Sequence, residues 1–332
     1  MLMLAGMMGL ALVGASAFVG LSEDDPGDDL EGEFDEANLE RHGAAGTGDP
    51  GRALLDLVEN EIIVGTGGAD ALDGGDGDDQ VGGYSGEDDL NGGAGADVIW
   101  AMGGADFVDG QSGDDELHGG GAEDSIFGGT GADNLFGHMG SDLLSGELGD
   151  DIAHGGEGND LIKGGSGDDA LHGGLGDDLI EGGAGNDTLF GGSGDDWIGD
   201  FNRKLADSDD FGKSIERDYL NGGEGNDTLV GDSGDVMTLG AGGDTAVLGS
   251  WIGSGDDAAK VMDFLTGEDQ LILVCPEGTG TGHNVSIDKD PSETRIVLDG
   301  KVIAKLPSGT LIRPDDIVLM QESAAEAFMQ PG

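Results

Sequence analysis

An aspartate recurs at every ninth position from Asp70 to Asp196, fifteen times in a row without insertion or deletion. An apolar residue stands two positions after each aspartate, as Leu171 follows Asp169. Glycine stands five positions before the aspartate in fourteen of the fifteen units, and two positions before it also in fourteen. A repeat of fixed length means that each unit adopts the same local structure and stacks on its neighbours, so the chain is predicted to form a solenoid.

The composition without this period would indicate a disordered chain. Of 332 residues, 71 are glycine and 70 are acidic, against 13 lysine and arginine residues, and the net charge is -57. A chain this acidic excludes nucleic acid as a partner, because phosphate binding needs basic residues. Cys275 is the single cysteine, so no disulfide framework forms within one chain. The natural partner of so many carboxylates is a cation.

The local structure of one repeat follows from its residue types. Glycine adopts positive φ without steric cost, so the glycines mark a turn. The three residues after each aspartate, such as 170–172, suit a short strand whose middle side chain points inward. Two nonapeptides then make one coil of 18 residues, and each aspartate lies over the aspartate 18 positions away. The predicted fold is all-β: a parallel β-roll with two nonapeptides in each coil.

Stacked carboxylates repel one another and need a positive ion between them. Residues 65–199 contain 31 acidic residues and one basic residue, Lys163. Carboxylates together with bare loop carbonyls are the ligands that Ca²⁺ prefers. The inward side chains contribute roughly 2 kcal/mol each, far less in sum than the entropy lost on ordering the segment. Folding is therefore predicted to depend on calcium, with about a dozen ions between coils.

Residues 173–181, Gly-Gly-Leu-Gly-Asp-Asp-Leu-Ile-Glu, resemble the RTX (repeat-in-toxin, hemolysin-type) nonapeptide G-G-x-G-x-D-x-U-x, a known calcium-binding repeat. The resemblance extends over about residues 65–248, with five consecutive full matches in residues 155–199. It implies a parallel β-roll in which Ca²⁺ lies between the loops of adjacent coils. The second glycine is missing at Thr66, Tyr84, Met102, Gln111, His138 and Glu147, which weakens the prediction for several N-terminal loops.

The resemblance also implies which residues hold the ions: the motif aspartates through their side chains, and the glycine-rich loops through their carbonyls. The candidate aspartates are Asp70, Asp79, Asp88, Asp97, Asp106, Asp115, Asp124, Asp133, Asp142, Asp151, Asp160, Asp169, Asp178, Asp187, Asp196, Asp218 and Asp227. The candidate glycines are Gly155, Gly156, Gly158, Gly164, Gly165, Gly167, Gly173, Gly174, Gly176, Gly182, Gly183, Gly185, Gly191, Gly192 and Gly194.

Three segments precede the roll, which is assigned to residues 65–248. Residues 1–21 are apolar and long enough to span a bilayer, so they are either a retained membrane anchor or a cleaved signal. Residues 22–50 are acidic and predict a disordered spacer, whose charge favours the outer side of the membrane. Residues 51–64 are expected to cap the first coil.

Two further segments interrupt or end the array. Residues 200–217 replace the expected five residues with eighteen and carry Arg203, Lys204, Lys213 and Arg217. This insertion is either a tolerated surface loop, the favoured interpretation, or a binding loop. Residues 249–332 alternate apolar and polar residues, and Asp299-Gly300 predicts a two-residue hairpin. They are predicted to form a small antiparallel β cap over the last coil.

Other candidate chemistry is weak. Gly231-Asp232-Ser233-Gly234 resembles the nucleophile stretch of trypsin-like proteases but has no supported partners, and no H-E-x-x-H motif is present. His118, His154 and His172 share the ninth repeat position, and the last two should stack on adjacent coils. They form either a transition-metal site or, as we favour, a surface ladder with Phe136 and Phe190.

These features predict a non-enzymatic, extracellular or cell-surface protein that folds on binding Ca²⁺ and has a structural, adhesive or matrix role. Its surface or carbohydrate ligand is unidentified, and the family resemblance makes type I export a candidate secretion route. One alternative is an accessory module of a secreted carbohydrate-active or hydrolytic enzyme. Another is a passive calcium buffer.

Overall fold

The computed structural model describes residues 60–199, 216–249, 251–252, 257–276 and 282–328. The predicted anchor or signal (1–21), the spacer (22–50), most of the N-terminal cap and residues 200–215 of the insertion lie outside these ranges. Of the cap, residues 62–64 form a strand that pairs with the first coil. No helix among the described residues has the length and apolarity needed to cross a membrane.

Two sheets, called here sheet A and sheet B, form the roll. In spatial order sheet A contains β1 (Ile62–Val64), β3 (Gln80–Ser85), β5 (Val98–Gly103), β7 (Glu116–Gly121), β9 (Asn134–Met139), β11 (Ile152–Glu157), β13 (Ala170–Leu175), β15 (Thr188–Ser193), β17 (Tyr219–Glu224), β19 (Val236–Ala241), β21 (Ala259–Val261), β25 (Lys301–Pro307), β24 (Glu293–Leu298) and β23 (Val285–Lys289). Sheet B contains β2 (Ala71–Asp76), β4 (Asp89–Ala94), β6 (Phe107–Ser112), β8 (Ser125–Thr130), β10 (Leu143–Leu148), β12 (Leu161–Ser166), β14 (Leu179–Ala184), β16 (Trp197–Gly199), β18 (Thr228–Val230), β20 (Thr245–Gly249), β22 (Gln270–Cys275) and β26 (Ile317–Gln321).

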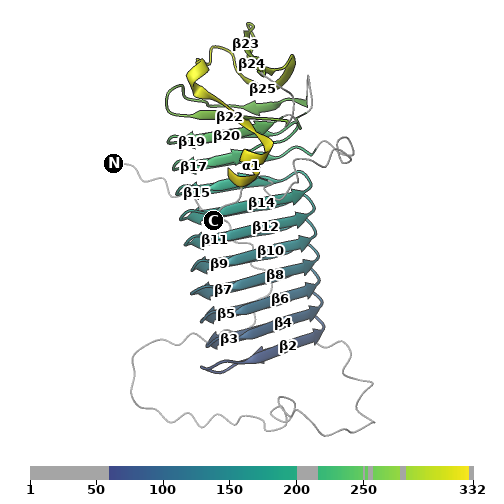
Figure 1. The fold of residues 1–332 in the computed structure, drawn as a ribbon. Helices are drawn as coiled ribbons and strands as arrows, with labels where there is room; N and C mark the ends of the chain where they lie inside the picture. Colours follow the sequence, from purple (N-terminus) through teal and green to yellow (C-terminus); the bar gives the residue numbers. More distant parts are fainter. Residues whose placement is uncertain (1–59, 200–215, 250, 253–256, 277–281, 329–332) are drawn as a thin grey trace, which may run out of the picture. The chain divides into compact units, whose positions relative to one another are not determined.

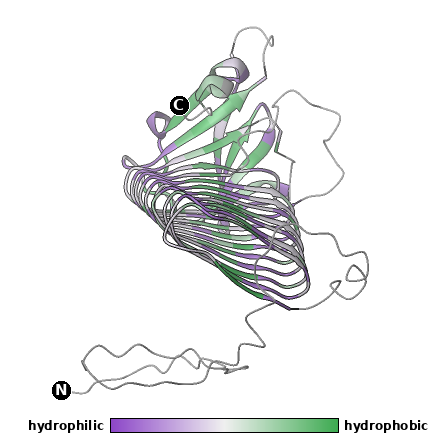
Figure 2. Ribbon diagram, turned by 90° about the horizontal axis from the view of Figure 1, so that it is seen from below, coloured by the Kyte–Doolittle hydropathy of each residue, from purple (hydrophilic) through white to green (hydrophobic). Residues whose placement is uncertain are grey.

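From β1 to β22 consecutive strands alternate between the two sheets, so one strand of each sheet makes one coil (Figure 1). Up to β20 each strand pairs in parallel with the strand two positions later, and Leu161 lies beside Leu179, 18 residues on. Viewed along the stack, the coils superpose closely (Figure 2). The predicted parallel β-roll of two nonapeptides per coil is confirmed, and the solenoid has about nine turns.

The strands are longer than the sequence predicted. A typical strand has six residues, as in β13, and includes the first two glycines of the next repeat. The turn is correspondingly short. Pairing skips the first glycine of each repeat, so Gly164 and Gly182 are absent from the ladder between β12 and β14. Glycine followed by glycine therefore continues the strand past the apolar residue, and the tight turn starts only at the third glycine.

The core of the roll is thin because a typical strand turns only two residues inward. In β13 these are Leu171 and Gly173, which are buried, while His172 faces out. The inward apolar residues from Leu90 to Ile198 are at most 1 % exposed. Burying one such side chain contributes about 2 kcal/mol, and the facing glycine contributes almost nothing. Local hydrophobic burial is therefore small for the length of chain that it orders.

Stacking continues across the 200–217 insertion. Thr188 in β15 pairs with Tyr219 in β17, although 31 positions separate the two residues in the chain. On the other sheet, Ile198 in β16 pairs with Leu229 in β18. The repeat predicted to resume at Asp218 therefore takes its expected place in the roll.

Parallel pairing also continues beyond residue 248, where the sequence placed the end of the roll. β20 pairs in parallel with β22, and β22 with β26. Among the strands of the described residues, antiparallel pairing occurs in β23, β24 and β25 alone. The C-terminal segment thus adds further parallel strands to both sheets and only one antiparallel meander. A 3-10 helix, η2 (Pro314–Asp316), and a short helix, α1 (Glu322–Phe328), complete the described residues.

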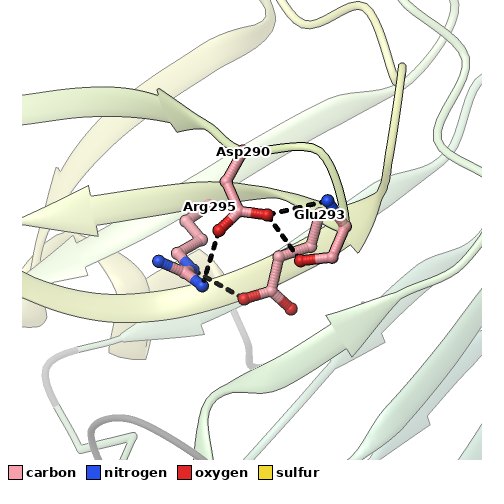
Figure 3. A network of polar contacts seen from close by, with 4 residues as sticks. Asp290, Glu293 and Arg295 are labelled. Atoms are coloured by element: carbon pink, nitrogen blue, oxygen red, sulfur yellow. Dashed lines mark hydrogen bonds and ion pairs between the residues drawn. The ribbon is translucent and has the colours of Figure 1, made fainter.

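Two turns hold this meander. Asp299 and Gly300 join β24 to β25 with φ values of 52° and 85°, as expected for the predicted two-residue hairpin. Between β23 and β24, Arg295 bridges the other turn: its guanidinium contacts Asp290 at 3.2 Å and Glu293 at 2.6 Å (Figure 3). The backbone N–H of Asp290 donates to the carbonyl of Glu293 at 3.0 Å, which closes that turn.

Candidate functional site

The motif aspartates form two ladders, one along each series of turns. In each ladder the backbone N–H of one aspartate donates to Oδ1 of the aspartate in the next coil; Asp160 donates to Asp178, and Asp178 to Asp196, at 2.8 and 2.9 Å. One ladder runs through Asp70, Asp88, Asp106, Asp124, Asp142, Asp160, Asp178, Asp196, Asp227, Asp244 and Asp269. The other runs through Asp79, Asp97, Asp115, Asp133, Asp151, Asp169, Asp187, Asp218 and Asp235.

In most of these residues the second carboxylate oxygen is buried without a hydrogen-bond partner. From Asp79 to Asp196 the ladder aspartates are at most 3 % exposed. A buried carboxylate oxygen without a partner is costly, so such an atom calls for a ligand. The Oδ2 atoms that lack a partner belong to Asp79, Asp88, Asp97, Asp106, Asp115, Asp124, Asp133, Asp142, Asp151, Asp160, Asp169, Asp178, Asp187, Asp196, Asp227 and Asp244.

This set agrees with the predicted aspartates except at its ends. Asp70 is only partly buried, and its Oδ2 accepts hydrogen bonds from the backbone and hydroxyl of Thr66. Asp218 lies in its ladder, but its Oδ2 is not among the unpartnered atoms. Asp244 was not predicted and has the same unpartnered oxygen.

The first glycine of each predicted loop makes room for this oxygen. A methyl group built on Gly164 would overlap Oδ2 of Asp169 and would lie 2.5 Å from the carbonyl oxygen of Gly182 in the next coil. The same arrangement surrounds Gly155, Gly173 and Gly191. At Gly182 the overlap is with Oδ2 of Asp187. A carboxylate oxygen and a carbonyl oxygen from adjacent coils thus share the space that a side chain would fill.

The other predicted glycines shape the loop around that space. The second glycines (Gly156, Gly165, Gly174, Gly183, Gly192) and the fourth residues (Gly158, Gly167, Gly176, Gly185, Gly194) all have positive φ, such as 127° at Gly176. The carbonyl of each fourth-position glycine faces the equivalent glycine of the next coil, as Gly167 faces Gly185. These turns therefore present backbone oxygens toward the neighbouring coil.

Burial and stacking disfavour the charged form of the ladder. Burial, together with the charges of Asp160, Asp196 and Asp177, raises the pKa of Asp178 to about 8. The pKa values of Asp115, Asp124, Asp169 and Asp196 are raised to about 7 for the same two reasons. In each case desolvation is the larger cause, and the hydrogen bond from the preceding coil opposes it only in part. A bound cation would reverse this shift.

A second set of contacts, which the sequence did not reveal, lies one position before the motif aspartate. Asp177 is exposed, and its Oδ1 accepts the backbone N–H of Asp195 at 2.9 Å. Asp150 and Asp168 accept in the same way from the next coil. These side chains reach toward the following coil, whereas the motif aspartates reach toward the preceding one. Adjacent turns are therefore joined in both directions.

The oxygen atoms present in these loops fit a hard divalent cation. No cluster of three or more His, Cys, Asp or Glu side chains that could hold a metal occurs in the described part of the chain. The space beside the first glycine of each predicted loop instead contains a carboxylate oxygen and a backbone carbonyl oxygen. Oxygen atoms of both kinds are the usual ligands of Ca²⁺, which accepts flexible geometry.

The histidines at the ninth position form the surface ladder favoured by the sequence. On sheet A the rings follow the order Trp100, His118, Phe136, His154, His172 and Phe190, with neighbouring centroids 4.7 to 6.3 Å apart. The rings of His154 and His172 are tilted by 44° at 5.8 Å. Residues 231–234, which resemble a protease nucleophile stretch, lie between β18 and β19.

A family model supports these assignments. The family model for the RTX calcium-binding nonapeptide repeat (4 copies) matches residues 59–90, 82–117, 109–144, 118–153, 145–180, 172–198 and 215–246. Among solved structures, one match is the crystal structure of extracellular lipase LipA from Serratia marcescens, at 18% sequence identity and a TM-score of 0.22. That match covers 68% of this chain and 45% of the lipase.

No curated protein matches the chain. The RTX family model, by contrast, covers more than half of the 332 residues, and its matches coincide with the stacked coils and their aspartate ladders. The chain belongs to the family of RTX calcium-binding nonapeptide repeat proteins.

Proposed function

We propose that the protein is an extracellular, non-enzymatic scaffold whose repeats fold when Ca²⁺ fills the spaces between the aspartate ladders. The observation that carries the proposal is the row of buried Oδ2 atoms without hydrogen-bond partners. The predicted motif aspartates and glycine carbonyls are the ligands in this proposal, with about a dozen ions along the roll.

The charge of the roll supports coupling between calcium and folding. Residues 65–199 carry 31 acidic residues and one basic residue. Without cations, aspartates in successive coils repel each other from within hydrogen-bonded turns, and the thin core offers little compensation. A divalent ion in each space removes that repulsion and supplies the missing partner of Oδ2. If free Ca²⁺ is tenfold above its dissociation constant, each site adds about 1.4 kcal/mol to the stability of the fold.

The proposed location follows from the same dependence. A chain that needs many weakly held ions stays unfolded where free calcium is scarce and folds where it is plentiful, and sites of extracellular modules typically bind in the millimolar range. Folding outside the cell suits a structural, adhesive or matrix role. Protease treatment of intact cells, with and without calcium chelation, tests this location: digestion only after chelation is expected, and protection under both conditions would contradict it.

The calcium dependence is tested by circular dichroism of residues 51–332 titrated with Ca²⁺ or Mg²⁺. Strand signal should be low in chelator and should appear cooperatively in millimolar Ca²⁺. Mg²⁺ should not replace Ca²⁺, because it demands tighter octahedral geometry and loses water reluctantly. Native-like strand content in excess chelator at neutral pH would refute the proposed coupling.

The non-enzymatic part of the proposal is supported by how the described residues are used: nearly all lie in stacked strands or in the short turns between them. The alternative is an accessory module of a secreted hydrolytic or carbohydrate-active enzyme. Assays of the calcium-loaded protein with ester and glycoside substrates separate the two. Turnover that survives substitution of ladder aspartates but is lost on deleting residues 200–217 would favour the enzyme.

A further inference from the structure

Sheet A carries a hollow on its outer face that the calcium ladders do not use. Its floor is the glycine run 119–121 in β7, where three consecutive residues lack side chains. Bulky side chains from the neighbouring coils rise around it: Trp100 and Met102 from β5, His138 and Met139 from β9. His118 and Glu157 complete the wall of this hollow of about 590 Å³. β5, β7 and β9 are consecutive strands of the sheet (Figure 1).

Two imidazole nitrogens meet at the wall of the hollow. Nδ1 of His118 lies 3.0 Å from Nε2 of His138, and the two rings are nearly parallel at 19°. The other nitrogen of His118, Nε2, lies 3.0 Å from Oε1 of Glu116. Because the Glu116 carboxylate accepts a hydrogen bond, Nε2 of His118 carries the hydrogen, and the lone pair on Nδ1 accepts the N–H of Nε2 of His138 when no metal is bound. A carboxylate behind a histidine is the usual way in which proteins orient a metal-binding imidazole.

His138 occupies a backbone position that disfavours it. Its φ is +74°, in the region that favours glycine, and its partners in register, Gly120 and Gly156, have φ values of +117° and +121°. A side chain there costs on the order of 1 kcal/mol relative to glycine. Tyr84, Met102, Gln111 and Glu147 share this repeat position and a positive φ, so the backbone alone does not single out His138. What distinguishes His138 is that its imidazole lies against that of His118.

The chemistry of the two side chains suits a transition metal. A neutral imidazole carries one N–H and one lone pair, so a shift of the hydrogen of His138 from Nε2 to Nδ1 turns its Nε2 lone pair toward that of His118. An imidazole nitrogen suits Zn²⁺, Cu²⁺ and Ni²⁺, whereas Ca²⁺ prefers oxygen.

Ring stacking argues against a sugar as the occupant. His118 lies face to face with Phe136 at 4.7 Å and 10°, and with Trp100 at 5.8 Å and 19°. The faces of the central rings are covered by one another, so the ladder offers mainly ring edges outward. A sugar stacks on an aromatic face, whereas a metal ion binds an imidazole at its edge.

We propose that His118 and His138 form a site for one late first-row transition ion, Zn²⁺ or Cu²⁺, separate from the calcium ladders. The two nitrogens supply two ligands, Glu116 orients His118, and the open hollow leaves the remaining coordination positions to water or to an added small ligand. A contact of 3.0 Å between the nitrogens allows both to reach one ion after a small outward rotation of the rings.

The test uses untagged protein held in millimolar Ca²⁺, so that the acidic ladders are occupied, and titrates Zn²⁺ or Cu²⁺ by calorimetry. One ion of the highest affinity should bind, and the Cu²⁺ form should show nitrogen hyperfine coupling from two imidazoles in electron paramagnetic resonance. His138→Gly restores the residue type of the neighbouring coils, so it should fold at least as well as the parent protein. It should weaken this binding at least about tenfold, since it removes one of two protein ligands.

A matched pair of substitutions controls for the ring ladder. His118→Phe keeps an aromatic ring in the stack, as Phe136 does in the next coil, but removes the nitrogen that faces His138. His154→Phe makes the same change at the next histidine of the ladder, outside the pair. The first variant should lose the tight ion and the second should keep it. Equal affinity in His118→Phe and the parent, or equal loss in the two variants, would overturn the proposal and leave a histidine–histidine hydrogen bond.

Discussion

Replacing Asp178 with asparagine should change the stability of the roll in opposite directions with and without calcium. Asp178 lies in the middle of one ladder: its Oδ1 accepts the N–H of Asp160 at 2.8 Å, and its own N–H donates to Asp196 at 2.9 Å. Asparagine keeps an oxygen at the same place, so the N–H of Asp160 retains an acceptor. The substitution therefore removes the charge and spares the hydrogen bond.

Without calcium the charge is harmful. Burial and the neighbouring carboxylates raise the pKa of Asp178 from 3.8 to about 8. At pH 7.5 this shift corresponds to a destabilisation of at most about 5 kcal/mol, because one pKa unit equals about 1.4 kcal/mol. Asp178→Asn should relieve much of it. In metal-free buffer the pH below which strand signal appears should therefore be higher in the variant than in the parent protein.

With calcium the same charge is useful. Asp178 borders two spaces between coils, one toward Asp160 and one toward Asp196. If each site contributes about 1.4 kcal/mol at tenfold saturation, weakening both removes about 3 kcal/mol. Urea unfolding in 10 mM Ca²⁺, followed by circular dichroism, should show this loss, and the calcium midpoint of folding should rise several-fold. Bound calcium measured by equilibrium dialysis should fall by up to about two ions.

The control is Asp177→Asn, which makes the same change in charge one residue earlier. Asp177 is exposed, and asparagine can still accept the N–H of Asp195, as Asn159 accepts that of Asp177. Its effect should stay within about 0.5 kcal/mol under both conditions. Equal shifts in the two variants would mean that calcium responds to a diffuse acidic surface. If Asp178→Asn changed the stability of the roll in the same direction with and without calcium, the proposed binding of calcium between ladder aspartates would be refuted.

Three further predictions concern pH, the C-terminal strands and the missing glycines. In metal-free buffer the roll should fold on acidification. The pKa values of the ladder aspartates in the folded state, about 6 to 8, lie above the ordinary 3.8, so their contribution to stability is fully present below pH 3.8 and is lost as the pH rises through 6 to 8. Circular dichroism that shows no strand signal at pH 4.5 would contradict this. Deleting residues 250–332 removes β21 and β22 and exposes the backbone edges of β19 and β20, so we expect this variant to aggregate on size-exclusion chromatography. Deleting only residues 322–332 leaves the strands of both sheets intact, so this control should remain monomeric. Glu147→Gly should raise the free energy of unfolding in Ca²⁺ by about 1 kcal/mol, because Glu147 has a φ of +74° and pairs in register with Gly129 and Gly165. The control Ser145→Gly, in the same strand, should lower the free energy of unfolding. A fall in the urea midpoint of both variants would count against backbone strain at Glu147.

Much of the roll could be predicted from spacing alone, because the repeat leaves one way to stack. An aspartate every nine residues, with an apolar residue two positions later, places Leu161 beside Leu179 and Asp160 beside Asp178 once two strands make a coil. The same spacing identified most of the aspartates whose second oxygen is buried and unpartnered. Periodicity therefore predicted both the fold and the position of the candidate ligands.

The period could not show where the stacking tolerates irregular spacing. Asp235, Asp244 and Asp269 continue the ladders at separations of 17, 17 and 25 residues, because loops of different length can return a strand to the same sheet. Gly242-Gly243-Asp244 resembles the repeat closely enough to have been a signal. The pairing of His118 with His138 was also hidden, since 20 residues separate them and neither position is equivalent to the other in the repeat.

The C-terminal strands have a further consequence for the order in which the molecule assembles. β20, β22 and the strands around them bury ordinary apolar side chains, among them Leu248, Ile272 and Val274. We therefore expect them to form a folding nucleus that depends little on metal. Each acidic turn, by contrast, becomes stable only against a turn that already exists, because its hydrogen-bond acceptors and its cation are shared with a neighbour. We therefore expect the chain to wind from its C-terminal end toward its N-terminal end, like a zipper closed from one side. A chain that emerged N-terminus first, from a ribosome or a narrow pore, would then stay extended until its final residues arrived, and pulse-labelled hydrogen exchange should detect protection at β22 before β4.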